Sequence, residues 1–210
     1  MHARSRTALV LILLTLTLGG IGSPADASSS MSRESIPAEE ELPPGWVEVT
    51  PDKADELAGD VGAMSNRTIQ SLYDWSCLNL ENWGTGRRIQ VYSWHGGLNQ
   101  DWAVWWNSSK KAYSIRSHYS TQCIDGYAGR GAQIVQYPCD NTNEQYFIIH
   151  YNYIEDYYVI ENLRYRGQCL DVRDNGRGYA VQLWDCVWNV DKPNQWWSID
   201  DGTWGTEPGS

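Results

Sequence analysis

The stretch from residue 168 to residue 197, QCLDVRDNGRGYAVQLWDCVWNVDKPNQWW, gathers side chains that suit the binding of a polar ligand. It holds a carboxylate two residues after a cysteine, several side-chain amides and several tryptophans, and its two cysteines bracket a glycine turn. A carboxylate can accept hydrogen bonds from two neighbouring hydroxyls, and an amide can both donate and accept. With a flat aromatic ring against a C–H face, these groups have the chemistry needed to bind a neutral sugar.

The same pattern occurs three times along the chain. Cys77, Cys123 and Cys169 lie 46 residues apart, and each is followed by an apolar residue and then by Asn or Asp. A glycine turn, a β-rich segment and a Gln-x-aromatic triplet follow each cysteine. The triplets are Gln100-Asp101-Trp102, Gln145-Tyr146-Phe147 and Gln195-Trp196-Trp197. A period of this length is too short for an independent domain, so each copy must bury its apolar face against the others.

The elements within each copy are expected to be short strands. Alternating runs rich in Val, Ile, Tyr and Trp are separated by Gly, Asn and Asp turns. The segments 103–117 and 147–163 have the pattern of hairpins with polar turns. No long stretch between them has the 3.6-residue periodicity of a helix. We therefore predict an all-β fold in which three units of about four strands close on one another and leave no exposed sheet edges.

These in-phase repeats resemble the ricin B-type lectin family. The features that carry the resemblance are the three Cys-Leu/Ile-Asp/Asn units, the glycine turns and the three Gln-x-aromatic endings. The resemblance implies a β-trefoil over residues 67–200, with repeats near 67–111, 112–156 and 157–200. It does not extend to residues 28–66.

The resemblance also implies where a carbohydrate would bind. In the third repeat all five binding positions match, and they are Asp171, Gln182, Trp184, Asn194 and Gln195. We assign Asp171 to paired hydroxyls and Trp184 to ring stacking. Asn194 is assigned to a third hydroxyl, while the two glutamines orient Asp171 and its loop.

The other two repeats match the family pattern less completely. The weaker positions are Asn79, Gln90, Tyr92, Asn99 and Gln100 in the first repeat, and Asp125, Tyr137 and Gln145 in the second. In the first repeat Asn replaces the binding Asp. In the second, Val135 and Glu144 replace the expected Gln and Asn. An alternative role for the Gln-x-aromatic residues is structural, with the aromatic ring in the core and the amide satisfying backbone groups.

Five cysteines leave one without a partner. Counting eight residues past each turn glycine reaches Cys139 and Cys186 in the second and third repeats, but Trp94 in the first. We predict bridges Cys123–Cys139 and Cys169–Cys186, each closing a loop of about fifteen residues and contributing roughly 3 kcal/mol. Cys77 is then an unpaired thiol, buried against Trp94 or, alternatively, bridged to another chain.

The N-terminal residues predict export followed by a linker. Residues 1–27 combine Arg4 and Arg6 with an apolar run and a small-residue cleavage site, as a signal peptide does. We therefore expect a secreted, extracellular protein. Residues 28–66 are rich in Ser, Pro and Glu and predict a mostly disordered acidic extension, in which Thr50-Pro51 could begin a short helix ending near Ala58. Residues 201–210 are expected to be a flexible tail.

The charge distribution excludes some classes of partner. The chain has a formal net charge of -10, while residues 66–199 carry 13 acids and 12 bases. There is no basic stripe for nucleic acid and none for anionic lipid, and the apolar leader is too short for a comfortable membrane span. Scattered His and paired Cys give no zinc-binding set, so neither a metal nor another cofactor is expected.

The sequence therefore predicts a secreted carbohydrate-binding protein that recognises neutral glycans mainly through its third repeat. Catalysis is not expected, because no segment outside the repeats could build a cleft with two facing carboxylates. The alternative is a lectin-like adaptor or targeting subunit that docks a secreted protein partner. Two incomplete sugar sites, the unpaired Cys77 and exposed-looking aromatics favour this alternative, the aromatics being Trp83, Trp105, Trp188 and Trp204.

Overall fold

The computed structural model describes residues 42–53, 64–81, 88–173, 180–189 and 192–200. The predicted signal peptide, much of the predicted linker and the tail lie outside these ranges, as do Trp83 and Trp204. Residues 51–53 are helical, and the Lys53 N–H donates to Thr50 Oγ1 at 3.4 Å, as an N-cap requires. The remainder of the predicted helix to Ala58 lies outside the described residues. Within the described ranges, no helix is long and apolar enough to cross a bilayer.

Strands make up nearly all regular structure of the described residues, so the predicted all-β class is confirmed. They are β1 (Trp46–Glu48), β2 (Met64–Ser71), β3 (Cys77–Leu80), β4 (Ile89–Tyr92), β5 (Trp102–Asn107), β6 (Ala112–Ser117), β7 (Cys123–Asp125), β8 (Val135–Tyr137), β9 (Tyr146–Asn152), β10 (Tyr157–Asn162), β11 (Gln168–Val172), β12 (Val181–Asp185) and β13 (Trp197–Asp200). Three short 3-10 turns, η1 (Leu98–Gln100), η2 (Asn143–Gln145) and η3 (Pro193–Gln195), precede β5, β9 and β13.

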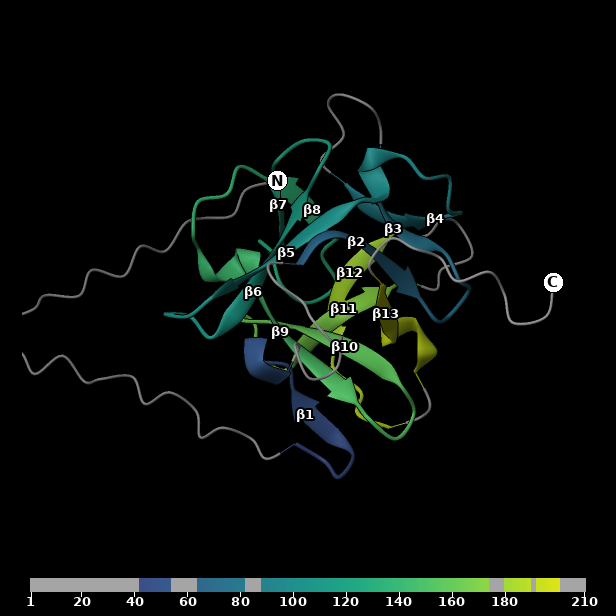
Figure 1. Ribbon diagram of the computed structural model, residues 1–210, viewed down its shortest axis with the longest axis vertical. Coiled ribbons are helices and arrows are strands. Elements are labelled where there is room, and N and C mark those ends of the chain that lie inside the picture. The colour runs from purple at the N-terminus through teal and green to yellow at the C-terminus, as the bar shows by residue number, and fades with distance from the viewer. Residues whose placement is uncertain (1–41, 54–63, 82–87, 174–179, 190–191, 201–210) are drawn as a thin grey trace, which may run out of the picture. The chain divides into compact units, whose positions relative to one another are not determined.

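Six of these strands form a closed ring. The first and fourth strands of each repeat pair as β2–β5, β6–β9 and β10–β13, and successive repeats join through β5–β6, β9–β10 and β13–β2. The two middle strands of each repeat form the hairpins β3–β4, β7–β8 and β11–β12, which continue from the ring (Figure 1). Closure pairs the edges that an open sheet would expose. The chain is a β-trefoil of three repeats, as predicted.

The aromatic residues of the three triplets lie in the core. Trp102, Phe147 and Trp197 are fully buried at equivalent positions, as the first residues of β5 and β13 and the second residue of β9. The indole N–H of Trp102 donates to Leu78 O at 2.9 Å, and that of Trp197 donates to Leu170 O at 3.2 Å. Burial of a large ring with its polar atom satisfied stabilises the fold. The structural role predicted for these side chains is confirmed.

Each repeat also makes the same left-handed turn two residues before its first cysteine. The residues at this position are Trp75, Thr121 and Gly167, with φ of 62°, 59° and 78°. Glycine adopts this conformation without steric cost, whereas the Cβ of Trp75 and Thr121 costs roughly 1–2 kcal/mol. The turn therefore belongs to the shared backbone frame and persists where the residue type is unfavourable.

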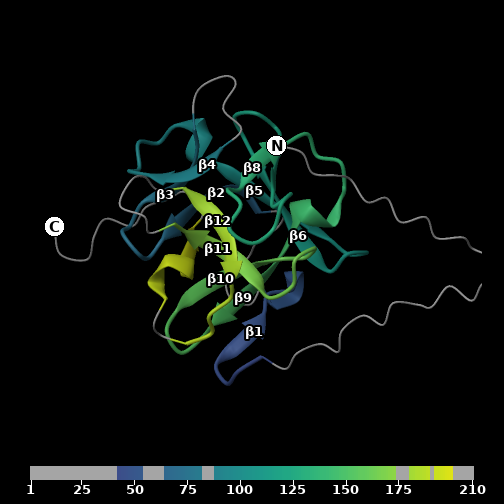
Figure 2. The same ribbon diagram turned by 180° about the vertical axis from the view of Figure 1, so that it is seen from behind.

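An additional strand from outside the repeats covers β9. β1 pairs antiparallel with β9 and lies beside it in Figure 1 and Figure 2. Trp46 of β1 is buried and makes edge-to-face contacts with Tyr157 at 5.4 Å and with Trp188 at 5.1 Å. The prediction that Trp188 is exposed is wrong, because Trp46 and His150 cover its ring. Trp105 is exposed as predicted.

Candidate functional site

The β11–β12 hairpin positions the site residues of the third repeat. In its register Cys169 lies opposite Trp184 and Asp171 lies opposite Gln182. Directly opposed residues of an antiparallel pair project to the same face. The first two hairpins have the same register, with Asn79 opposite Gln90 and Asp125 opposite Val135. The correspondence between repeats that was inferred from the sequence is therefore confirmed.

The Asp171 carboxylate is buried and accepts three side-chain hydrogen bonds. Gln182 Nε2 donates to Oδ1 at 2.9 Å, while Asn194 Nδ2 and Gln195 Nε2 donate to Oδ2 at 2.6 and 3.0 Å. Only 3% of the residue is exposed. Burial raises the pKa of Asp171 above its ordinary value, and the amide hydrogen bonds together with Lys192 partly offset this. An ionised carboxylate offers about four lone pairs, so about one acceptor position remains, on Oδ1.

Gln195 fastens this arrangement to the backbone. Its Oε1 accepts from Val187 N at 2.9 Å, and its Nε2 donates to Asp185 O at 2.9 Å as well as to Asp171. The residue is completely buried. Gln195 thus orients Asp171 and also closes the loop between β12 and η3. The binding role and the structural role predicted for it are therefore both present in one side chain.

A cavity of about 570 Å³ opens beside Asp171, within the size range of small-molecule sites. Its lining residues are Gly131, Asp171, Arg173, Gln182, Trp184, Lys192 and Asn194. Four of the five predicted site residues therefore lie together on the cavity wall, and Gln195 lies behind Asp171. Trp184 is half-buried and lines the cavity.

Three cations near this cavity were missed by the sequence analysis. Arg173 Nε donates to Gln182 Oε1 at 2.8 Å, and Arg173 Nη2 donates to Gly131 O at 2.7 Å. The Arg130 guanidinium lies 3.9 Å from the centre of the Trp184 ring and forms a 2.8 Å ion pair with Asp185. Lys192 completes the set. Arg173 follows Asp171 by two residues, a spacing that could have indicated it, whereas Arg130 comes from the second repeat.

The first repeat brings its amides together without a carboxylate. Asn99 Nδ2 donates to Asn79 Oδ1 at 2.8 Å, and Asn79 Nδ2 donates to Leu80 O at 3.0 Å. Gln100 is buried and donates to Tyr92 O and Ser93 O, so it holds its loop as Gln195 does. Gln90 is half-buried opposite Asn79, and Tyr92 is 53% exposed. This repeat lacks the charged acceptor.

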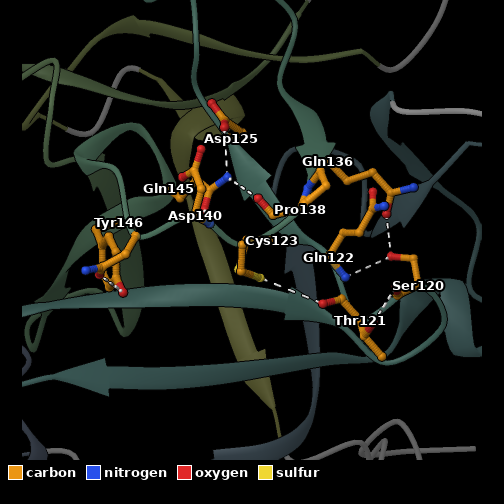
Figure 3. Close-up of a disulfide and its surroundings, with 12 residues drawn as sticks. Ser120, Thr121, Gln122, Cys123, Asp125, Gln136, Pro138, Asp140, Gln145 and Tyr146 are labelled. Atoms are coloured by element: carbon orange, nitrogen blue, oxygen red, sulfur yellow. Dashed lines mark hydrogen bonds between the residues drawn. A yellow bond between two sulfur atoms is a disulfide. The ribbon is translucent and has the colours of Figure 1, made fainter.

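The second repeat keeps the carboxylate but has one of its three amide neighbours, because Val135 and Glu144 stand at the positions of Gln182 and Asn194. Gln145 Nε2 donates to Asp125 Oδ2 and to Pro138 O, both at 3.0 Å, and Figure 3 shows its side chain between them. Val135 stands opposite Asp125, and Tyr137 is 44% exposed. Burial raises the pKa of Asp125, the Gln145 hydrogen bond lowers it, and Asp140 and Glu144 raise it further.

The cysteines pair as predicted. Cys123 bridges Cys139 and Cys169 bridges Cys186, so each of these repeats is cross-linked locally. Cys77 is unpaired and buried, and burial, followed by the charges of Asp200 and Asp74, raises the pKa of its thiol to about 12. Trp94 at the partner position is half exposed. A thiol with this pKa stays protonated and unreactive at neutral pH.

Comparison with known proteins finds one matching family model and several solved structures of similar fold. Residues 98–184 match the model of the ricin-type beta-trefoil lectin domain-like family, and no curated protein matches the chain. The designed threefold-symmetric protein ThreeFoil has 22% identity and a TM-score of 0.55, over 64% of this chain and 96% of its own. The ricin B-like lectin of Macrolepiota procera, solved with lactose, has 24% identity and a TM-score of 0.53, over 67% of this chain and 98% of its own.

A mosquitocidal holotoxin is similar over 68% of this chain but over 18% of its own, with 20% identity and a TM-score of 0.59. At these identities the solved structures establish the shared fold. Together with the three repeats and the match over residues 98–184, that fold makes the chain similar to the ricin-type β-trefoil lectin-like family.

Proposed function

We propose that this protein binds carbohydrate, mainly through its third repeat. The observation that carries the proposal is the buried Asp171 carboxylate, held by three amide donors on the wall of a cavity that also presents Trp184. Asp171 would accept from a sugar hydroxyl, and the Trp184 ring would stack on the C–H face. The lactose complex of the Macrolepiota procera relative supports the assignment.

The cost of burying Asp171 supports a binding role over a structural one. Its pKa is raised by burial, so the ionised side chain is less stable in the folded protein than in water. Gln145 and Gln100 hold their loops by the same backbone contacts, and the first repeat does so with no carboxylate present. The fold therefore does not require the charge that the third repeat keeps.

The proposed activity is binding without hydrolysis. Glycoside hydrolysis needs two carboxyl groups facing one bond, roughly 5–9.5 Å apart. Among the described residues that line the cavity, Asp171 supplies the one carboxylate. A neutral hexose of the galactose type is the first ligand to test, as the family resemblance implies. We propose secretion as well, supported by the N-terminal leader pattern and the two disulfides.

A glycan array with the secreted chain tests this function. Trp184→Ala should lose most of the signal, because it removes the stacking surface. Tyr137→Ala changes the equivalent position of the second repeat, which is also exposed, and should keep the signal. Loss of binding in both variants, or in neither, would contradict the assignment to the third repeat.

Docking of a protein partner is the second candidate function. Large aromatic side chains of the first repeat are exposed, including Trp75 at 66% and Trp94 at 54%, and exposed aromatics are favoured anchors at interfaces. The partial match to a holotoxin chain fits a subunit role. A stoichiometric partner that is recovered from culture fluid despite excess free sugar, and lost in Trp75→Ala, would support docking over simple lectin activity.

A further inference from the structure

We infer that the third-repeat cavity prefers a sugar that carries a carboxylate, and that Arg173 and Lys192 bind this anionic group. The inference rests on the proposed carbohydrate binding by the third repeat and replaces the expectation of a neutral glycan, which considered only the five family positions. Those positions supply one negative charge and no positive charge. Arg173 and Lys192, which line the same cavity, add two positive charges.

The described lining of the cavity has a formal charge of opposite sign to that of the protein. Its described lining includes one carboxylate, Asp171, and two cations, Arg173 and Lys192, which gives a formal charge of +1. The chain as a whole has a formal charge of -10. Arg130 is left out of this sum because Asp185 neutralises it at 2.8 Å. A cationic hollow on an acidic protein concentrates anionic ligands and repels cationic ones.

The hydrogen-bonding capacity of the cavity also favours an acceptor-rich ligand. The three amides leave Asp171 with about one position for a ligand donor. Arg173 has five N–H donors, and its contacts with Gln182 Oε1 and Gly131 O use two of them. Those two contacts also fix the plane of the guanidinium. A fixed guanidinium favours a carboxylate, which it can bind through two parallel hydrogen bonds.

The other two repeats show that the fold does not need these cations. Two residues after the Asp or Asn position, Glu81 and Tyr127 occupy the places of Arg173 in the first and second repeats. The first and third repeats share the backbone geometry at this position, since Arg173 N donates to Ala180 O at 2.8 Å and Glu81 N donates to Arg88 O at 2.9 Å. Two residues before the Asn194 position, Gly97 and Thr142 occupy the places of Lys192. Both cations therefore occur together only in the repeat with the complete site.

Calorimetry with the full secreted chain and matched sugar pairs tests the inference. The probes are methyl galactoside and methyl galactosiduronate, methyl glucoside and methyl glucuronide, and lactose and sialyllactose. In at least one pair the acidic sugar should bind about 5- to 30-fold more tightly at low salt, as expected for charge-assisted hydrogen bonds. The preference should shrink as NaCl is raised.

The readout in each variant is the ratio of acidic to neutral affinity, which is insensitive to a general loss of binding. Lys192→Gln changes an exposed side chain and should reduce the ratio, and Arg173→Gln should reduce it further. Lys111→Gln removes an exposed lysine that is not part of the cavity lining and should leave the ratio unchanged. Equal affinities within every pair, or a ratio that neither cavity variant changes, would overturn the inference alone. Absence of binding to every sugar would overturn the proposed function and the inference together.

Discussion

Asp171→Asn separates the binding role of the carboxylate from its structural role. The substitution keeps the shape of the side chain, removes its charge and replaces one of its two acceptor oxygens by an NH2 group. A hydrogen bond to a charged group contributes about 1.5–3 kcal/mol and a neutral one about 0.5–1.5 kcal/mol. With about one acceptor position open to a ligand, the loss should be about 1–2 kcal/mol, or roughly 5- to 30-fold in Kd.

The same variant, although it binds sugar more weakly, should become more stable relative to the parent as pH rises. Because the folded pKa of Asp171 is raised, the ionised side chain lowers stability as pH rises through its unfolded value and then through its folded value. The Asn variant lacks this penalty. Its stability relative to the parent should therefore improve between acid and neutral pH, and sugar binding by the parent should weaken on acidification at a higher pH than for an ordinary Asp.

Sugar titration and urea unfolding, each performed across this pH range, provide the two measurements. Asp125→Asn is the matched control, since Asp125 occupies the same register position but has Val135 in place of Gln182. This control should leave binding through the third repeat unchanged. The reasoning is refuted if Asp171→Asn binds as tightly as the parent, or if the two substitutions reduce binding equally.

Three further predictions concern the frame of the fold. Cys77, with a pKa of about 12, should react with iodoacetamide only after unfolding, and rapid labelling of the native protein would contradict its burial. Burial opposes ionisation of Glu161, but hydrogen bonds led by His150 lower its pKa to about 2. The ionised Glu161 should therefore stabilise the fold by about 3 kcal/mol above pH 4.5, and this contribution should disappear as pH falls towards 2. In Glu161→Gln the free energy of unfolding measured in urea should change less with pH over that range. Thr121→Gly should raise the unfolding free energy by about 1 kcal/mol, because it removes a Cβ from a residue with positive φ. Gly167→Ala should lower it by about 1 kcal/mol, because the added Cβ meets no atom within 4 Å and adds backbone strain alone. Thermal midpoints equal to that of the parent would contradict both expectations.

The fold was predictable because its signals are local and repeated three times. The spacing of Cys77, Cys123 and Cys169 set the repeat, and the buried triplets confirmed the register. Strand β1 was not predicted, because three residues within an acidic, Pro-rich segment give no periodicity to read. Its position depends on long-range contacts of Trp46 with Trp188, and composition does not report such contacts.

The candidate site was only partly predictable, for a related reason. Asp171, Gln182 and Asn194 come from one repeat, and they were found by comparing repeats. Arg130 reaches Trp184 from the neighbouring repeat, so no pattern within one repeat could place it. Arg173 lies in the same repeat as Asp171, but the other repeats have Glu81 and Tyr127 at its position, so a comparison of shared residues does not select it. A search for what the repeats have in common passes over the residues that make one repeat different.

The hydrogen bonds of the triplet glutamines explain how the repeats can differ without loss of the fold. The Oε1 atoms of Gln100, Gln145 and Gln195 each accept from a backbone N–H at 2.9 Å, and their Nε2 atoms each donate to a backbone carbonyl. Backbone partners are present whatever the side chains are, so the loop stays closed when the neighbouring Asp becomes Asn79. Substitutions around the hairpins are therefore free to change the ligand chemistry of one repeat at a time. The three hairpins accordingly differ in chemistry: the first has an amide pair, the second a carboxylate with one amide donor, and the third a carboxylate with three amide donors beside two cations.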